Sequence, residues 1–327
     1  MSDSFDSNRF VTLSYKCTLM KLISIACLII CSFFIGKCQP AKKTISKESN
    51  IVQLQNVPYN IHSIDHVIVL PRELVEVSGL AYNVEQSTLM VVNDEVGHIY
   101  ELDKDEGSIL TKNKFADFGD YEGIEFLNND LIVNRSNGII YFYNQESKTT
   151  YKIIRTNLST KNNIEGITYD ASKNQILLAC KGTPNVPGLI ENTKGKLICI
   201  YDIESENLLE EPFILIKDKQ LKKSVEQIYK DIGLTESQLD NLKNRVEGFA
   251  PSGLAIHPIS GDVYVLSAQK SLLVVINSLR KIKHIHFLDQ DMHVQPEGIC
   301  FTPSGDMYIS NEGKNRSAKI YFYKYQH

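Results

Sequence analysis

Hydrophobic residues in this chain recur in short runs bounded by turn residues, and one small motif opens five of these runs. In each copy a Ser or Glu is followed by Gly and then by Leu or Ile. The copies are Ser78–Tyr82, Glu122–Phe126, Glu165–Tyr169, Ser252–Ile256 and Glu297–Phe301. Successive motif glycines are 44, 43, 87 and 45 residues apart, and the longest step is one unit plus an insertion. Periods of about 40 to 50 residues are typical of propeller blades.

Each motif is followed by further short runs rich in Val, Ile, Tyr and Phe. The runs are too short for helices and apolar on both faces, as expected when blades pack face to face. A fainter fourth strand is predicted at residues 112–118, 151–154, 213–216 and 283–287. The fifth unit shows three strands, and an unassigned strand at His66–Leu70 precedes the first motif, so pairing the two would close the ring. The sequence therefore predicts an all-β, five-bladed propeller of four-stranded blades, with six blades as the alternative.

Residues 217–247 interrupt the repeat and change its character to Lys, Glu, Gln and Leu. Leu221, Val225 and Ile228 recur at helical spacing, and Thr235 and Gln238 have capping-box form. Two short helices are predicted here. They form either a packed decoration on one rim of the propeller, which we favour, or a lid or partner surface over the channel mouth.

The N-terminal region differs from the repeats. Residues 22–36 are fifteen positions without a charge, which suits a signal-peptide core better than a membrane span of about 20 residues. Residues 35–38 resemble a bacterial lipobox ending in Cys38, although Lys37 is irregular there. We predict a leader at 1–38 with lipidation at Cys38, a polar tether at 39–61 and a propeller domain at 62–327. Met20 is an alternative start, and secretion without a lipid anchor is the alternative fate.

Composition narrows the classes of function. The net charge is -4, and no basic run interleaves with aromatic residues beyond the tether, which argues against nucleic-acid binding. The chain has no Trp, so it lacks the blade signature of WD40 repeats. Cys180, Cys199 and Cys300 fall inside apolar strands without zinc spacing. We interpret them as small buried hydrophobic residues rather than as a disulfide framework.

Candidate chemistry lies on the leading residue of the motif. The first strand of each blade lines a propeller channel, so these five positions should converge on one mouth. Carboxylates about 6 Å apart would repel by about 3 kcal/mol per pair at an effective dielectric of about 20. A ring that contains Glu122, Glu165 and Glu297 therefore needs a cation, a basic side chain or protonation.

Oxygen-bearing residues also stand at the ends of three second strands. They are Asn93 with Asp94 and Glu95, Asn134, and Asn311 with Glu312. Carboxylate and amide oxygens without His or Cys suit calcium. The predicted ligands are Glu122, Glu165, Glu297, Asn93, Asn134 and Asn311. In the alternative interpretation the leading residues only hydrogen-bond to the neighbouring blade, and Gly is required where blades crowd at the axis.

The Glu-Gly-Ile motifs, together with residues 250–258 and 295–299, resemble the SdiA-regulated family of bacterial cell-envelope proteins. The resemblance covers about residues 64–325, nearly all of the predicted folded part. It implies a five-bladed propeller distantly related to NHL-repeat propellers, with a calcium site and without an established activity. Glu122, Glu165 and Glu297 are the positions that match the family pattern, whereas the three asparagines come from the predicted geometry alone.

Two classes of function remain open. In the first, an exported and membrane-tethered calcium-binding propeller of the bacterial envelope presents its rim to a protein or small ligand. In the second, the protein is a calcium-dependent hydrolase of the lactonase, esterase or phytase-like kind, with His98 or His257 as a base. No Gly-x-Ser-x-Gly elbow is present, and both histidines have structural interpretations, so binding is favoured.

Overall fold

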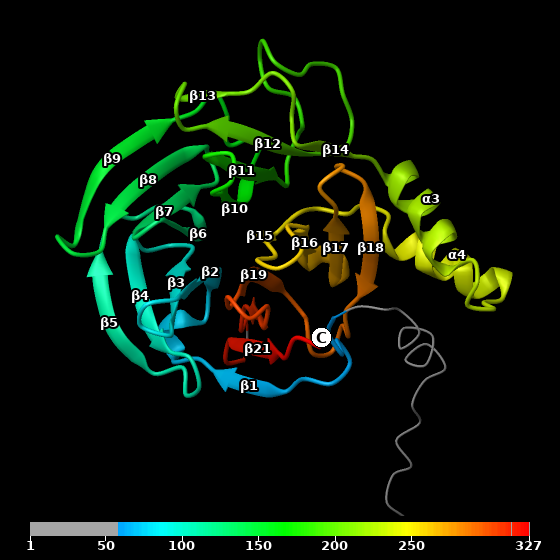
Figure 1. Ribbon diagram of the computed structural model, residues 1–327, viewed down its shortest axis with the longest axis horizontal. Coiled ribbons are helices and arrows are strands. Elements are labelled where there is room, and N and C mark those ends of the chain that lie inside the picture. Colours follow the sequence, from blue (N-terminus) through cyan, green and yellow to red (C-terminus); the bar gives the residue numbers. More distant parts are fainter. Residues whose placement is uncertain (1–57, 315, 327) are drawn as a thin grey trace, which may run out of the picture. The chain divides into compact units, whose positions relative to one another are not determined.

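The computed structural model describes residues 58–314 and 316–326. The predicted leader and Cys38 lie outside these residues. Within the described part, five antiparallel sheets stand around a common centre, which confirms the five-bladed propeller and excludes the six-bladed alternative (Figure 1). No described helix is long and apolar enough to cross a membrane.

The sheets follow the sequence repeat, and each begins with a motif strand at the centre. The strands of blades 1 to 3 are β2 (Val77–Asn83), β3 (Thr88–Asn93), β4 (His98–Asp103), β5 (Ile109–Lys114); β6 (Tyr121–Leu127), β7 (Asp130–Arg135), β8 (Ile139–Asn144), β9 (Thr149–Arg155); and β10 (Ile164–Asp170), β11 (Gln175–Cys180), β12 (Lys196–Asp202), β13 (Asn207–Leu208), β14 (Ile214–Ile216). Those of blades 4 and 5 are β15 (Gly253–Ile256), β16 (Val263–Ser267), β17 (Leu272–Ile276), β18 (Ile282–Phe287); and β19 (Pro296–Phe301), β20 (Met307–Asn311), β21 (Lys319–Tyr323), β1 (His66–Val69). Two short 3-10 helices lie at Arg72–Leu74 and Ala268–Lys270.

The N-terminal strand closes the ring as predicted. β1 pairs antiparallel with β21, from His66 opposite Phe322 to Val69 opposite Lys319. The first and last described strands therefore lie side by side in one sheet (Figure 1). The predicted fourth strand of blade 1 was placed too late, because β5 covers 109–114 instead of 112–118. In blade 3 the outer edge is divided between β13 and β14, which both pair with β12.

Strands apolar on both faces pack against both neighbouring blades. Leu131 and Val133 of β7 join the cluster shared with blade 1, and Ile132 between them joins the cluster shared with blade 3. Five such clusters fill the spaces between neighbouring blades. Tyr59 and Ile61, at the end of the predicted tether, are buried in the cluster between blades 4 and 5.

The insertion forms the two predicted helices, α3 (Asp218–Tyr229) and α4 (Glu236–Arg245). Thr235 and Gln238 make the predicted capping box at the start of α4. The buried face of α3 packs on the cluster between blades 3 and 4, and the hydroxyl of Tyr229 donates a hydrogen bond to the carbonyl of Ile285 in β18 at 2.9 Å. Both helices lie at the outer edge of the ring (Figure 1), so the insertion is the packed decoration and not the lid.

The three cysteines of the described strands are buried and free, as the sequence predicts. The sulfurs of Cys180 and Cys199 are 4.0 Å apart across β11 and β12. That distance is a contact between two thiols and is about twice the length of a disulfide bond.

Candidate metal centre

The motif glycines bring neighbouring blades into contact at the axis. A Cβ atom on Gly79 would lie 2.7 Å from the Cα atom of Gly123, and one on Gly253 would lie 2.2 Å from the carbonyl oxygen of Glu297. Equivalent clashes occur at Gly123, Gly166 and Gly298. Any side chain would push the first strands apart, because separations below 3.0 Å essentially never occur for a real Cβ atom. The Gly of the motif is therefore a requirement of ring closure.

The two motif serines also link blades. The hydroxyl of Ser78 donates to the carbonyl of Glu122 at 2.8 Å, and that of Ser252 donates to the carbonyl of Pro296 at 2.6 Å. Each serine therefore satisfies a backbone group of the next blade. At these two positions the leading residue of the motif hydrogen-bonds to the neighbouring blade, as the alternative interpretation of the motif predicts.

The three motif glutamates have different surroundings. Glu165 is buried, and its Oε1 lies 3.1 Å from Nζ of Lys181. Glu122 accepts a hydrogen bond from the Ser78 hydroxyl at 3.2 Å. Glu297 is 5% exposed, and its Oε2 has no hydrogen-bond partner among the described residues. The ring thus contains one ion-paired carboxylate and two that lack a basic partner.

Burial and mutual repulsion raise the pKa of Glu122 and of Glu297. Burial, followed by the charges of Glu165 and Asp120, raises the pKa of Glu122 to about 9. Burial, followed by the charges of Glu165 and Glu312, raises the pKa of Glu297 to about 8. Burial of Lys181 lowers its pKa, but the surrounding carboxylates outweigh this effect and raise it overall. Lys181 is therefore a charged ammonium group within the glutamate ring.

The three predicted asparagines do not occupy equivalent places. Asn93 and Asn311 pair with Val77 and Pro296 in their ladders, whereas Asn134 pairs with Gly123. In blade 2 the position equivalent to Asn93 belongs to Arg135, opposite Tyr121. The sequence prediction treated Asn134 as equivalent to Asn93 and Asn311, but Asn134 lies one residue away from this register.

Two of the asparagines keep an unused oxygen. Oδ1 of Asn93 accepts the backbone N–H groups of Glu95 and Val96, which caps the turn after β3. Oδ1 of Asn134 and Oδ1 of Asn311 are buried and have no hydrogen-bond partner in the described part of the chain. Buried amide oxygens without a partner are uncommon and are consistent with a missing ligand.

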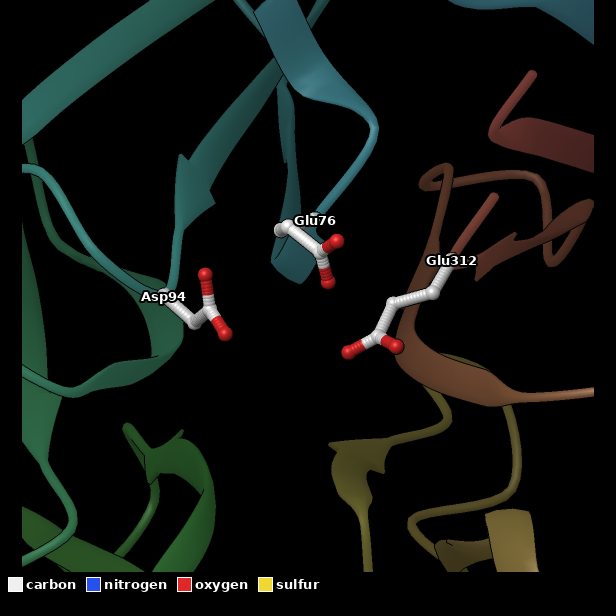
Figure 2. Close-up of side chains that lie close together, drawn as sticks. All are labelled: Glu76, Asp94 and Glu312. Atoms are coloured by element: carbon white, nitrogen blue, oxygen red, sulfur yellow. The ribbon is translucent and has the colours of Figure 1, made fainter. Parts of the chain in front are cut away.

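The compact acidic group of the described residues is Glu76, Asp94 and Glu312, whose ligand oxygens all lie within 4.8 Å of one another. Figure 2 shows the three carboxylates directed toward one another. Glu76 precedes β2, Asp94 follows β3, and Glu312 follows β20. Asp94 and Glu312 had been noted beside the predicted ligands, whereas sequence reasoning missed Glu76.

Backbone hydrogen bonds hold this group together across the closure of the ring. The N–H of Asp94 donates to the carbonyl of Glu76 at 3.3 Å, which extends the β2–β3 ladder. The N–H of Gly313 donates to the carbonyl of Val75 at 2.8 Å, which joins blade 5 to blade 1. Glu76 follows Val75 and Glu312 precedes Gly313, so this hydrogen bond brings the backbones of Glu76 and Glu312 close together.

The group has no ion-pair partner among the described residues, although the more distant charges of Lys314 and Lys181 act on Glu312. None of the ion pairs within the described residues includes Glu76, Asp94 or Glu312. Burial, then the charges of Glu76 and Glu95, raises the pKa of Asp94 to about 6. Burial, then the charges of Glu76 and Asp94, raises the pKa of Glu312 to about 7. Two carboxylates at this separation repel by about 3 kcal/mol at an effective dielectric of about 20, so the group favours protons or a cation.

A repeated signal marks the position of Glu76. The residue two places before the leading residue of the motif is polar in four of the five units: Glu76, Asp120, Asn163 and Gln295, with Ala250 in the fourth. The carbonyls of Asp120, Asn163 and Gln295 accept the N–H groups of Ser136, Lys181 and Glu312. Every polar unit thus repeats the cross-strand pair of Glu76 and Asp94, and pairing these positions would have placed Glu76 beside Asp94.

Neither candidate histidine belongs to the acidic group. His257 follows β15 at the end opposite the motif, is buried among aromatic rings, and accepts the N–H of Ser260 at 3.1 Å. His98 opens β4, and its pKa is lowered by burial and then by Lys112 and Lys114. The acidic group itself contains no histidine among the described residues. The structure therefore supplies no geometric support for either residue as a hydrolytic base.

Comparison with known proteins agrees with the fold. A family model described as SdiA-regulated matches residues 64–323. No curated protein sequence matches the chain significantly. Among solved structures, glutaminyl cyclase from Myxococcus xanthus has a TM-score of 0.54 and 10% identity, and the match covers 81% of this chain and 96% of that one. At this identity the likeness shows the fold alone.

Two further solved structures match with lower scores. A nidogen/laminin complex gives a TM-score of 0.42 at 14% identity over 72% of each chain. A luciferin-regenerating enzyme gives 0.43 at 12% identity and covers 79% of this chain and 94% of that one.

Proposed function

Because the chain belongs to the SdiA-regulated family, we propose that this propeller binds calcium at its mouth and presents that face to a protein or small-molecule ligand. We further propose that the protein is exported and tethered to the membrane of the bacterial envelope through Cys38. The activity is binding, with the ion organising the mouth.

The observation that carries the calcium proposal is the group of Glu76, Asp94 and Glu312 within 4.8 Å and without a basic partner in the described residues. All three donors are carboxylates, which suit a hard cation that takes six to eight oxygen ligands. Oδ1 of Asp94 is buried and lacks a hydrogen-bond partner in the described part of the chain. Nearby Glu297 and Asn311 each keep a further unpartnered oxygen. The donor set therefore fits calcium.

The glutamate ring is the weaker candidate. Lys181 already supplies a positive charge to Glu165, and its pKa is also raised by Glu297. A lysine within a carboxylate ring takes the place that a cation would otherwise fill. We therefore assign the principal calcium ligands to the acidic group and only a supporting role to Glu297.

A cation bound there would have a structural effect. Glu76 belongs to blade 1 and Glu312 to blade 5, so an ion held by both would cross-link the two blades where the ring closes. Binding to the folded state alone raises stability in proportion to the logarithm of the calcium concentration above the Kd.

Calorimetric titration with calcium, together with thermal melts in calcium and in chelator, tests the proposal. Wild type should bind one ion at the acidic group and melt at a higher temperature with calcium. The variant Glu76→Gln, Asp94→Asn, Glu312→Gln should lose both effects. The variant Glu122→Gln, Glu165→Gln, Glu297→Gln should keep calcium binding, because Lys181 serves that ring. Glu146→Gln, which removes an exposed charge from blade 2, is the control.

Identical wild-type melts in calcium and in chelator, with no heat of binding, contradict the calcium proposal. If the variant of Glu122, Glu165 and Glu297 loses calcium binding and the variant of Glu76, Asp94 and Glu312 keeps it, the calcium site is the glutamate ring. The first outcome tests whether the protein has a calcium site, and the second tests which residues form it.

A further inference from the structure

A pocket of about 530 Å³ opens beside the acidic group on blade 5. Glu312 belongs both to this pocket and to the acidic group. Asn311, Tyr321 and Met292 also line the pocket. The volume is in the range of small-molecule sites, which occupy about 300 to 1,000 Å³. The proposed ion would therefore lie at the edge of a cavity large enough for a ligand.

Three basic side chains, Lys314, Arg316 and Lys319, line this pocket together with two acidic ones, Glu312 and Asp291. None of the three belongs to an ion pair among the described residues. Lys314 and Arg316 follow Gly313 in the turn after β20, and Lys319 opens β21. The pocket thus gathers positive charge, free of ion pairs among the described residues, next to an acidic group.

The side chain of Asn311 is evidence for a ligand that does not depend on these charges. Its side chain is 4% exposed, and its Nδ2 lies 3.3 Å from Nδ1 of His293. Its Oδ1 has no hydrogen-bond partner in the described part of the chain, although it is buried beside the pocket. An orphaned amide oxygen of this kind accepts a hydrogen bond from a ligand or binds a cation.

We propose that the pocket binds a small molecule through an oxyanion, a carboxylate or a phosphate group, which bridges the calcium ion of the acidic group and the basic side chains of Lys314, Arg316 and Lys319. This inference rests on the calcium proposal above. It specifies the ligand that the propeller mouth recognises.

Charge decides the class of ligand. A cationic ligand would meet three basic side chains on the pocket wall and would compete with calcium for the same carboxylates. An anionic ligand meets opposite charge on both sides once the ion is bound, and charge-assisted hydrogen bonds to Arg and Lys are the stronger kind. Without the ion, the carboxylate of Glu312 repels the same anion. The arrangement therefore predicts that anion binding depends on calcium.

Calorimetric titration of the full chain with phenyl phosphate and, separately, with acetate tests the proposal. Each titration is run in calcium and in chelator. Wild type should bind at least one of the two anions in calcium and at least about tenfold more weakly in chelator. Binding of phenyl phosphate alone assigns a phosphate ligand, and binding of acetate assigns a carboxylate ligand; either result supports the bridging site.

The variant Lys314→Ala, Arg316→Ala, Lys319→Ala should weaken anion binding by about tenfold or more and leave calcium binding intact. Lys219→Ala, Lys223→Ala, Lys230→Ala removes the same charge from exposed positions in and after α3 and serves as the control. The thermal melt of each variant in calcium verifies folding.

Four results overturn the inference: neither anion binds in calcium, binding is equal in chelator, the pocket variant binds anion like wild type, or the control variant loses binding equally. A titration with calcium alone shows which of the two proposals has failed. If calcium binds but the anion does not, the ligand inference fails and the calcium proposal stands. If calcium itself does not bind, the calcium proposal fails first.

Discussion

The ammonium nitrogen of Lys181 lies 3.1 Å from Oε1 of Glu165, inside the ring of motif glutamates. The side chain of Glu165 is 4% exposed and that of Lys181 is 40% exposed. One end of the pair is therefore buried and the other reaches solvent. This pair distinguishes the glutamate ring, which contains an ion pair, from the acidic group of Glu76, Asp94 and Glu312, which has no ion pair among the described residues.

Removal of the lysine should destabilise the fold. Lys181→Ala leaves the buried carboxylate of Glu165 without its partner, and partial exposure of the lysine reduces the effect to about 1–2 kcal/mol in the free energy of unfolding. Lys114→Ala is the control, because its partner Asp117 is 91% exposed, and should change stability by less than about 0.5 kcal/mol. Urea unfolding at neutral pH measures both. Equal stability of the Lys181 variant and wild type contradicts a charged pair.

The buried carboxyl groups predict that stability depends on pH. The pKa of Glu297 is raised from 4.5 to about 8, so between these values the folded state holds a proton that the unfolded chain has lost. The free energy of unfolding should therefore fall as pH rises from about 4.5 to about 8 in the absence of calcium. Urea unfolding across this range measures the slope. Glu297→Gln should reduce the slope without abolishing it, because burial also raises the pKa values of Glu122 and Glu312. A wild-type stability that rises through the same window contradicts the raised pKa.

The contact of motif glycines at the axis predicts a large effect of one methyl group. Gly253→Ala places a Cβ atom 2.2 Å from the carbonyl of Glu297 and should cost about 3 kcal/mol or prevent folding. Gly233→Ala is the comparison, because no atom lies within 4 Å of its Cβ position and only its positive φ of 71° opposes the change. That variant should lose about 1 kcal/mol. Thermal melts distinguish the two, and equal losses would refute the steric explanation.

Substitutions on the buried and the exposed face of β1 test how much this strand contributes to closure of the ring. Ile68 is 1% exposed and Val69 is 53% exposed, since alternate residues point to opposite faces. Ile68→Ala should lower the free energy of unfolding by about 2–4 kcal/mol. Val69→Ala should change it by no more than about 0.5 kcal/mol. Urea unfolding gives both values. A tolerated Ile68→Ala would show that β1 contributes little to closure.

The proposed membrane tether concerns the leader, outside the described residues. Expression in a bacterial host with a labelled fatty acid should place label on the wild-type protein and recover it in the membrane fraction. Cys38→Ser should abolish labelling, because the thiol is the acceptor. Cys31→Ser, in the uncharged stretch, should label normally. Persistent labelling of the Cys38 variant would exclude this residue as the lipid site.

Much of the fold follows from local pattern in the sequence. The spacing of Gly79, Gly123 and Gly166 sets the blade period, because strand and turn preferences act over a few residues. The count of five and the closing strand at His66–Val69 followed from the same repeat. Spacing did not identify the residue of blade 2 that is equivalent to Asn93, because strand pairing places Arg135 and not Asn134 opposite Tyr121. Which residues face each other across a ladder depends on turn lengths and bulges, and the spacing of residue types along the chain does not reveal it.

The acidic group shows where sequence reasoning ends. By itself the sequence determined five blades, the glycines that crowd at the axis and a mouth rich in acidic residues. Only the tertiary structure decided that Glu76, Asp94 and Glu312 meet, while Lys181 neutralises part of the motif ring. Closure places the first and last blades side by side and joins Gly313 to Val75 through the backbone. Electrostatic interaction depends on distance in space, and residues at opposite ends of a repeat become neighbours only when the ring closes.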